Sequence, residues 1–268
     1  MQIFNSKIQS EILEKNIQEV VGKGIGMEKI LSIIQVGNNE SSNKFIDLKV
    51  KLCGKYGILC EVTKIDESKN DDEIFQIVEN IFSNESVGGG IIQLPLPRKS
   101  LEKVLDFIPI EKDVDVISTE GKKRFYSGDF SKLSPVVRAF ENFLSNCDIN
   151  YNGLKAVVIG EGDLVGKTIS FYLSKKGASV ETISSYKSGD KLDCELLVLA
   201  TGIPNLVKGE AISVDCNVVD FGSSVIDDKC VGDLDMSSSI NHLGCISKSP
   251  GGMGPLVVRY LLLNFINQ

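Results

Sequence analysis

The chain has 268 residues, 42% of them hydrophobic and 24% charged, which suits a globular protein of one large domain or two smaller ones. This composition excludes collagen-like repeats and coiled coil, and no apolar run reaches the ~18 residues of a membrane span. The N-terminal residues lack the basic-then-apolar layout of a secretion signal. The net charge of −7 argues against a nucleic-acid backbone as partner, because such binding needs clustered Lys and Arg. We therefore expect a cytoplasmic protein that binds neither nucleic acid nor membrane.

The cysteines and the single histidine limit the possible metal and redox sites. The seven cysteines are scattered and none forms Cys-x-x-Cys, so we expect neither a disulfide framework nor a zinc cluster. His242 is the only histidine, which excludes metal sites built on several histidines. We expect His242 to be a loop or strand-end residue, and we predict no metal.

Helical and strand patterns alternate along the first half of the chain, which is typical of an α/β protein with a largely parallel sheet. Apolar residues at helical spacing between Ile8 and Val21 predict a helix that stops at Gly22–Gly26. The following strands are expected at Ile30–Val36, Ile58–Ile65 and Gly90–Gln93, and the helices between them at Ser42–Tyr56 and Asp71–Phe82. Periodicity fades over Asp113–Leu133, and we expect a loop there.

A second α/β series follows a helix at Pro135–Leu144. Its strands are expected at Lys155–Ile159, Ser179–Ile183, Leu196–Ala200 and Asn217–Phe221, with helices at Gly166–Lys175 and Pro255–Ile266. The fold class is thus α/β, with two lobes, the second a Rossmann-like parallel sheet, and a cleft between them. We expect residues 1–134, completed by 251–268, to form the first lobe and residues 135–250 the second.

A glycine loop follows the first strand of the second series and opens a helix. Gly160-Glu-Gly-Asp-Leu-Val-Gly166 has the strand-turn-helix context in which backbone amides and a helix N-terminus bind a pyrophosphate. Its spacing, G-x-G-x-x-x-G, is one residue longer than the usual fingerprint, and an ordinary glycine-containing turn is the alternative. The strand ends at Ala200–Pro204 and Asp220–Ser224 should border the same crevice.

Lys49 interrupts an apolar helical stripe formed by Phe45, Leu52 and Tyr56. A lysine there is costly unless its ammonium has partners or its pKa falls, and a lysine near neutrality is a candidate general base. The alternative is snorkelling, with only the aliphatic stem buried. Spacing alone slightly favours snorkelling, because Val50 and Cys53 could instead define the buried face.

Four segments, taken in order, resemble the bifunctional methylenetetrahydrofolate dehydrogenase/methenyltetrahydrofolate cyclohydrolase family. The segment Val36–Lys49 is similar to V-G-x-x-x-A-S-x-x-Y-V-x-x-K, and Gln93–Pro97 matches Q-L-P-L-P. Lys112–Asp115 matches K-D-V-D, and Pro250–Pro255 is similar to P-G-G-V-G-P. Together these segments extend over nearly the whole chain.

The resemblance implies oxidation of 5,10-methylenetetrahydrofolate with NADP, then hydrolysis of the methenyl product to 10-formyltetrahydrofolate. It implies a folate site between the lobes, a homodimer, and a role in one-carbon metabolism and purine biosynthesis. The implied catalytic residues are Lys49 as base, Gln93 to orient it, and Asp115 toward the pterin. The implied substrate-binding residues are Phe45, Leu94, Pro95, Gly251, Gly252 and Pro255, and the cofactor-binding residues are Gly160, Glu161, Gly162, Gly166, Ser185 and Ser223.

Several positions depart from the family pattern. Phe45 replaces the tyrosine one turn before the lysine, so dehydrogenase activity is predicted more firmly than cyclohydrolase activity. Glu161 replaces an arginine, and because a carboxylate repels a 2′-phosphate this predicts a preference for NAD, or weak nucleotide binding. Val116 replaces the glycine after K-D-V-D, and Ser184-Ser185 replaces His-Ser. The alternatives are a catalytically impaired homologue that still binds folate or nucleotide and, less well supported, a Rossmann dehydrogenase for another substrate.

Overall fold

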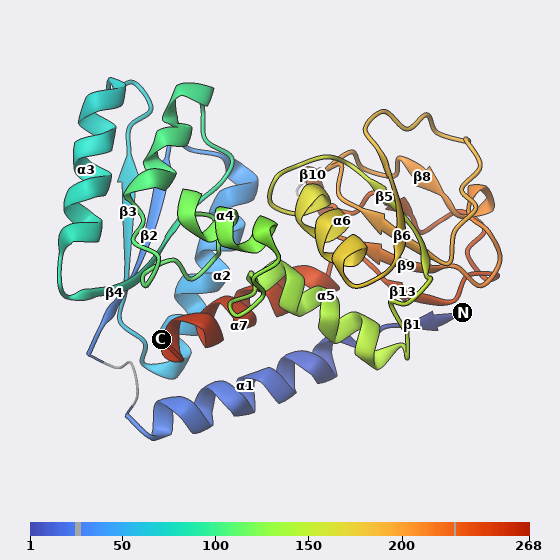
Figure 1. Cartoon of the computed structure of the whole chain (residues 1–268), viewed down its shortest axis with the longest axis horizontal. Coiled ribbons are helices and arrows are strands. Elements are labelled where there is room, and N and C mark those ends of the chain that lie inside the picture. The colour runs from blue at the N-terminus through green and yellow to red at the C-terminus, as the bar shows by residue number, and fades with distance from the viewer. Residues whose placement is uncertain (25–27, 228) are drawn as a thin grey trace. The chain divides into compact units, whose positions relative to one another are not determined.

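A computed structural model describes residues 1–24, 28–227 and 229–268 of the chain. It divides into two compact units, and the prediction of two α/β units is confirmed (Figure 1). Unit 1 comprises residues 1–11 and 136–257, and unit 2 comprises residues 12–135 and 258–268. Residues 1–11 and 251–257, expected with the first lobe, therefore belong with the other unit. The reason at the N-terminus is β1 (Gln2–Ile3), which pairs with a strand of the larger sheet.

Unit 2 is built on a three-stranded parallel sheet in the order β3-β2-β4. These strands are β2 (Ile30–Val36), β3 (Cys60–Ile65) and β4 (Val87–Ile92). The helices α2 (Glu40–Tyr56) and α3 (Asp71–Ser83) lie on opposite sides of the sheet (Figure 1). The unit also contains most of α1 (Ser6–Gly22), the 3₁₀ segment η1 (Lys99–Phe107) and the C-terminal half of α7 (Met253–Ile266). The helix stop expected over Gly22–Gly26 lies partly outside the described residues.

The prediction of a loop throughout Asp113–Leu133 is wrong, because α4 occupies Thr119–Ser127. Its sequence lacks a continuous apolar stripe, and its side chains bury only Phe125 fully. The helix is fixed instead by its ends. The side chain of Ser118 accepts a hydrogen bond from the Gly121 amide, and Gly128 closes the helix in the left-handed conformation with φ of 93°.

Unit 1 is built on a six-stranded sheet in the order β1-β13-β9-β7-β5-β6, and every pair of neighbours is parallel. The remaining strands of this sheet are β5 (Lys155–Ile159), β6 (Ser179–Ile183), β7 (Leu196–Leu199), β9 (Asn217–Asp220) and β13 (Cys245–Ser247). The helices are α5 (Pro135–Asn146), α6 (Gly166–Lys175) and the start of α7. Short elements complete the unit: β8 (Val207–Lys208), η2 (Gly209–Ala211), β10 (Ser224–Ile226), β11 (Lys229–Val231) and β12 (Leu234–Asp235). The Rossmann-like parallel sheet is thus confirmed.

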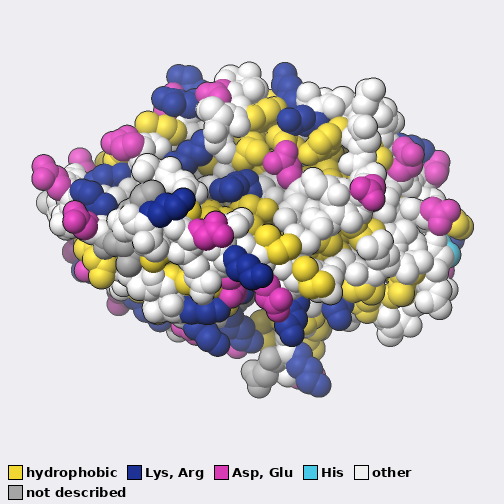
Figure 2. Space-filling view, turned by 90° about the horizontal axis from the view of Figure 1, so that it is seen from below, with side chains coloured by type: hydrophobic (Ala, Val, Ile, Leu, Met, Phe, Trp, Pro, Cys, Tyr) yellow, Lys and Arg dark blue, Asp and Glu magenta, His cyan; other side chains and the backbone are white. Residues whose placement is uncertain are grey.

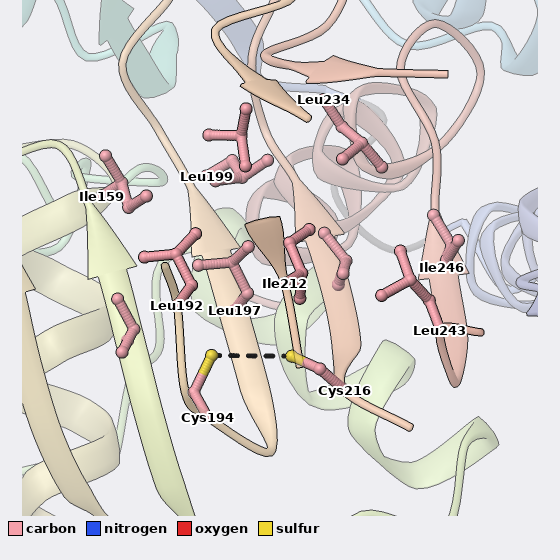
Figure 3. Close-up of a cluster of buried hydrophobic side chains, with 13 residues drawn as sticks. Ile159, Leu192, Cys194, Leu197, Leu199, Ile212, Cys216, Leu234, Leu243 and Ile246 are labelled. Carbon is pink, nitrogen blue, oxygen red and sulfur yellow. Dashed lines mark hydrogen bonds between the residues drawn. The ribbon is translucent and has the colours of Figure 1, made fainter. Parts of the chain in front are cut away.

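The core of unit 1 lies between this sheet and the segments that cross it. Figure 3 shows aliphatic side chains from β5, β7 and β13, among them Ile159, Leu197 and Ile246, packed together with side chains from the intervening loops. Each of these three side chains is at most 1% exposed. Burial of this continuous apolar layer holds the strands in place, so that their carboxyl ends form one edge of the sheet.

The cysteines are less scattered in space than in the sequence. The thiols of Cys194 and Cys216 lie 3.6 Å apart in this core (Figure 3). Cys147, next to the end of α5, is bonded to Cys245, the first residue of β13, a single disulfide that the sequence argument against a disulfide framework did not predict. The two residues are 98 positions apart in the sequence, and a search for closely spaced cysteines cannot find such a pair.

Charged side chains of both signs are interspersed over the face shown in Figure 2. Within residues 1–24, 28–227 and 229–268, no helix is both long and apolar enough to cross a membrane.

Candidate active site and dinucleotide loop

Lys49 is buried on α2, and its ammonium group is hydrogen-bonded inside unit 2. The side chain is 6% exposed, whereas the neighbouring Val50 is 40% exposed. Lys49 Nζ donates to Gln93 Oε1 at 2.7 Å. Snorkelling, which spacing alone favoured, is therefore wrong, and the head group as well as the stem lies inside.

Backbone contacts hold the two partners of this hydrogen bond in place. Gln93 directly follows β4, and its amide donates to the Ile34 carbonyl of β2 at 2.8 Å. Ser42 Oγ, on the first turn of α2, donates to the Leu94 carbonyl at 3.1 Å, and Gln93 Nε2 donates to the same carbonyl at 2.9 Å. The helix that carries Lys49 is thereby tied to the segment that carries Gln93.

Burial changes the charge balance of the site. It lowers the pKa of Lys49, although Asp115 and the thiols of Cys60 and Cys53 act in the opposite direction. Burial also raises the pKa of Asp115 to about 6, against the effect of the Lys49 charge. The site thus combines a lysine that gives up its proton readily with a carboxylate that is ionised at neutral pH.

Only one of the two aspartates in Lys112-Asp-Val-Asp115 is available to a ligand. Lys112 Nζ donates to the Phe82 carbonyl at 2.7 Å, at the end of α3. Asp113 is 1% exposed and accepts from the backbone amides of Ile117 and Ser118 at 3.1 and 2.9 Å. Asp115 accepts no hydrogen bond from any residue that the structure describes, so its oxygens can accept hydrogen bonds from a ligand.

The backbone next to Asp115 is anchored and strained. Asn264 Nδ2, on α7, donates to the Val114 and Leu133 carbonyls at 2.9 and 3.0 Å. Val116 has a φ of 57°, in the left-handed region that glycine tolerates and a β-branched residue does not. This conformation explains why the family pattern has a glycine there.

The remaining predicted substrate residues divide between the units. Phe45 and Leu94 are partly buried and Pro95 is exposed in unit 2, together with the Lys49–Gln93 pair. By contrast, Gly251, Gly252 and Pro255 belong to unit 1.

Sequence reasoning missed Gln35, which is 1% exposed near the carboxyl end of β2. The β2–β4 register pairs Ile34 with Ile92, so Gln35 is the strand neighbour of Gln93. Its Nε2 donates to Asn43 Oδ1 at 2.9 Å, while its buried Oε1 has no hydrogen-bond partner among the described residues. A polar residue at the carboxyl end of a mostly apolar strand was the available signal.

The glycine loop of unit 1 lies at the carboxyl ends of β5 and β7. Gly160 has a φ of 109°, and a Cβ there would collide with the Ala200 carbonyl. A Cβ on Gly166 would collide with the Gly160 carbonyl, whereas nothing lies within 4 Å of the Cβ position of Gly162. The first and last glycines therefore allow close backbone packing, and the middle one leaves space at the N-terminus of α6. This arrangement fits a dinucleotide pyrophosphate.

The other predicted cofactor residues lie on loops of the same unit. Glu161 and Ser185 are exposed, and Ser223 is partly buried after β9. Ser223 Oγ lies 3.5 Å from Cys230 Sγ. His242 is outside this group of loops and contacts the Ile212 carbonyl at 3.0 Å, as expected of a loop residue.

Two family sequence models match the chain. The tetrahydrofolate dehydrogenase/cyclohydrolase catalytic domain matches residues 3–115, and the NAD(P)-binding domain of the same family matches residues 135–268. The bifunctional protein FolD of Halothermothrix orenii is 31% identical over 98% of this chain and 96% of its own length. That of Mycoplasma mobile is 34% identical over 90% of this chain and 87% of its own length.

A solved structure has the same fold. The bifunctional FolD methylenetetrahydrofolate dehydrogenase/cyclohydrolase of Campylobacter jejuni is 28% identical and superposes with a TM-score of 0.87, over 100% of this chain and 98% of its own. With matches over both units, this chain belongs to the tetrahydrofolate dehydrogenase/cyclohydrolase family.

Proposed function

We propose that this protein oxidises 5,10-methylenetetrahydrofolate to the methenyl form with a nicotinamide dinucleotide, and hydrolyses that product to 10-formyltetrahydrofolate. Unit 2 holds the folate and unit 1 the dinucleotide. The observation that carries this proposal is the buried Lys49–Gln93 hydrogen bond, with Asp115 unengaged beside it. Family membership supports an active enzyme over the impaired homologue.

The oxidation step requires positioning more than proton transfer. The nitrogen lone pairs of the substrate drive hydride loss from the methylene carbon, and the bound dinucleotide supplies the hydride acceptor. The chain's contribution is to hold both partners. The Asp115 carboxylate accepts hydrogen bonds from pterin amino groups, since ionised oxygens are the strongest acceptors for such donors.

The hydrolysis step requires a base, and Lys49 supplies it. A water oxygen attacks the methenyl carbon, and its proton passes to the neutral amine of Lys49. The bond from that carbon to N5 then breaks as N5 takes up a proton and the new hydroxyl loses its own, which leaves the formyl group on N10. Gln93 Oε1, 2.7 Å from the amine nitrogen, orients the lysine for this transfer. Because burial lowers the pKa of Lys49, the neutral amine forms more readily than that of an exposed lysine.

We further propose that the enzyme prefers NAD to NADP. Glu161 is exposed in the glycine loop, at the position where the family pattern has an arginine. A carboxylate there repels a 2′-phosphate, whereas an arginine binds it.

The proposal also includes a cytoplasmic homodimer that serves one-carbon metabolism and purine biosynthesis. Its support is the family resemblance, in which homodimers are usual. Light scattering after gel filtration measures the oligomeric state, and a monomeric mass would contradict the dimer.

The activity is tested by adding 5,10-methylenetetrahydrofolate and either NAD or NADP to the purified protein and following nicotinamide absorbance. Reduction above background is expected, faster with NAD. No reduction with either dinucleotide would rule out the oxidation. Adding the methenyl compound alone and following its loss tests hydrolysis separately.

A further inference from the structure

Two buried carboxylates lie behind the dinucleotide loops of unit 1. Asp220 ends β9 and is 2% exposed, and Asp233 precedes β12 and is 0% exposed. Asp220 Oδ1 accepts from the Gly222 amide at 2.8 Å, while a Cβ on Gly222 would collide with the carboxylate of Asp233. A Cβ on Gly232 would in turn collide with the carboxylate of Asp220. The two carboxylates thus enclose Gly222, and glycines are required at both positions.

Asp233 fixes the loop that follows β7. Its Oδ2 accepts from the Thr201 amide at 2.6 Å, from Thr201 Oγ1 at 2.9 Å and from the Gly202 amide at 3.2 Å. The preceding residue, Ala200, is the one whose carbonyl packs against Gly160. Asp233 therefore holds in place the backbone against which the glycine loop packs.

Asp220 fixes the loop that follows β9 and the backbone of its partner. Its carboxylate accepts from the amides of Gly222, Asp233 and Leu234, the last two at 3.2 and 3.0 Å. The two loops are also joined directly, because Ser224 Oγ donates to the Gly202 carbonyl at 2.5 Å. Displacement of either carboxylate would move both loops.

The pair has an unbalanced charge. The ionisable group that faces Asp220 is Asp233, and neither carboxylate forms an ion pair with a described residue. Asp233 Oδ1 is buried with no hydrogen-bond partner in the part of the chain that the structure describes. Burial, with a contribution from Asp233, raises the pKa of Asp220 to about 7, and burial raises the pKa of Asp233 as well. The backbone amides that donate to both carboxylates favour the ionised forms, whereas two full negative charges in one buried site are unfavourable and favour a pair that keeps one proton.

We propose that Asp220 and Asp233 are positioning residues that share one proton in the binding-competent state, and that loss of this proton displaces residues 200–202 and 222–224 and weakens dinucleotide binding. The inference rests on the proposed dinucleotide site of unit 1. The inference predicts that the affinity for the dinucleotide falls as pH rises. As pH rises through 7 the pair goes from one negative charge to two, and the carboxylates repel each other. The phosphate-bearing ligand then meets more negative charge.

The test is the dissociation constant of NADH, measured by fluorescence between pH 6 and pH 8.5. NADH is chosen because, unlike NADPH, it has no 2′-phosphate that titrates in this range. We expect the constant to rise with pH, and a half-unit change in the pKa of the pair on binding corresponds to about a threefold rise. In Asp220→Asn the constant should no longer depend on pH, whereas Asp235→Asn, outside the pair, should keep the wild-type dependence.

A second measurement does not involve the cofactor. The infrared spectrum at pH 6.5 should contain the carbonyl band of a buried protonated carboxyl group, which disappears on raising the pH and is absent in Asp220→Asn. If that variant does not fold, Asp233→Asn provides the same comparison. A wild-type protein without this band, or an Asp220→Asn variant that retains the wild-type pH dependence, would overturn the shared proton. If neither NADH nor NADPH bound at any pH, the dinucleotide site would be overturned, and the effect on binding with it. The infrared band would still show whether the two carboxylates share a proton, so failure of the proposed function can be told apart from failure of the shared proton.

Discussion

The amine nitrogen of Lys49 lies 2.7 Å from the amide oxygen of Gln93, and this hydrogen bond joins α2 to the end of β4 within one unit. Its partner is uncharged, so the bond orients the lysine without holding its proton as firmly as a carboxylate would. The proposed hydrolysis step needs a buried base next to a neutral acceptor, and this pair provides that arrangement. The predictions below begin from this pair.

Replacing Lys49 with methionine should abolish hydrolysis of the methenyl substrate. Methionine fills a similar volume but cannot accept a proton, and removal of a general base typically costs on the order of 100-fold or more in rate. The rate is measured by loss of the methenyl absorbance. Lys51→Met, which changes an exposed lysine on the same helix, is the control and should keep the wild-type rate. Unchanged turnover in Lys49→Met would remove Lys49 from the mechanism.

Changing Gln93 to glutamate should move the pH profile of hydrolysis. A carboxylate within hydrogen-bonding distance raises the pKa of Lys49, so the rising limb, which follows deprotonation of the lysine, shifts to higher pH. At pH 7 the rate should fall. Gln93→Asn retains a neutral amide, and its limb should stay near the wild-type position even if the rate drops. If the pH profile of Gln93→Glu coincided with that of the wild type, the hydrolysis rate would not depend on the charge of Lys49.

Restoring a hydroxyl with Phe45→Tyr should increase hydrolysis. Phe45 is one turn before Lys49 on α2, and a phenol there could hydrogen-bond to the lysine. One hydrogen bond to a charged group allows a gain of up to about tenfold. Phe45→Leu lacks the hydroxyl and should show no gain. Equal hydrolysis rates for Phe45→Tyr and Phe45→Leu would mean that the missing hydroxyl does not limit hydrolysis.

Replacing Glu161 with arginine should shift the dinucleotide preference toward NADP. The change exchanges a repulsive group for one that binds a 2′-phosphate, and about a tenfold change in the ratio of dissociation constants is expected. Competition titrations with NAD and NADP measure this ratio. Glu210→Arg makes the same charge change at another exposed position of unit 1 and should leave the ratio unaltered. A wild-type protein that already prefers NADP clearly would contradict the role given to Glu161.

Val116→Gly should stabilise the protein. The residue has a φ of 57°, and relief of this left-handed strain is expected to raise the free energy of unfolding by about 1 kcal/mol, after the entropic cost of glycine. Urea unfolding measures the change. Val50→Gly, on the exposed side of α2, should have the opposite sign because its backbone is helical. A loss of stability in Val116→Gly would mean that packing of the valine outweighs its strain.

The elements that the sequence predicted well are those that bury a continuous apolar surface. The strands Ile30–Val36 and Lys155–Ile159 begin and end where the pattern placed them. The helix α4 was missed because its ends, and not an apolar stripe, determine it.

Site chemistry was predictable only in part. Family motifs identified Lys49 and Gln93, but the burial of the lysine depends on which side of α2 faces the sheet, and spacing left that open. Sequence likewise gave no means to tell which aspartate of Lys112-Asp-Val-Asp115 is engaged, since this depends on the turn at Ile117–Ser118. The Asp220–Asp233 pair joins residues that only the folded backbone brings together.

The two hydrogen bonds from Asn264 to the Val114 and Leu133 carbonyls have a consequence for biosynthesis. Unit 2 is interrupted in the chain by the 136–257 segment, and its aspartate loop is held by a side chain that the ribosome adds after that segment. The loop that carries Asp115 therefore acquires its final support only after the whole 136–257 segment has been synthesised.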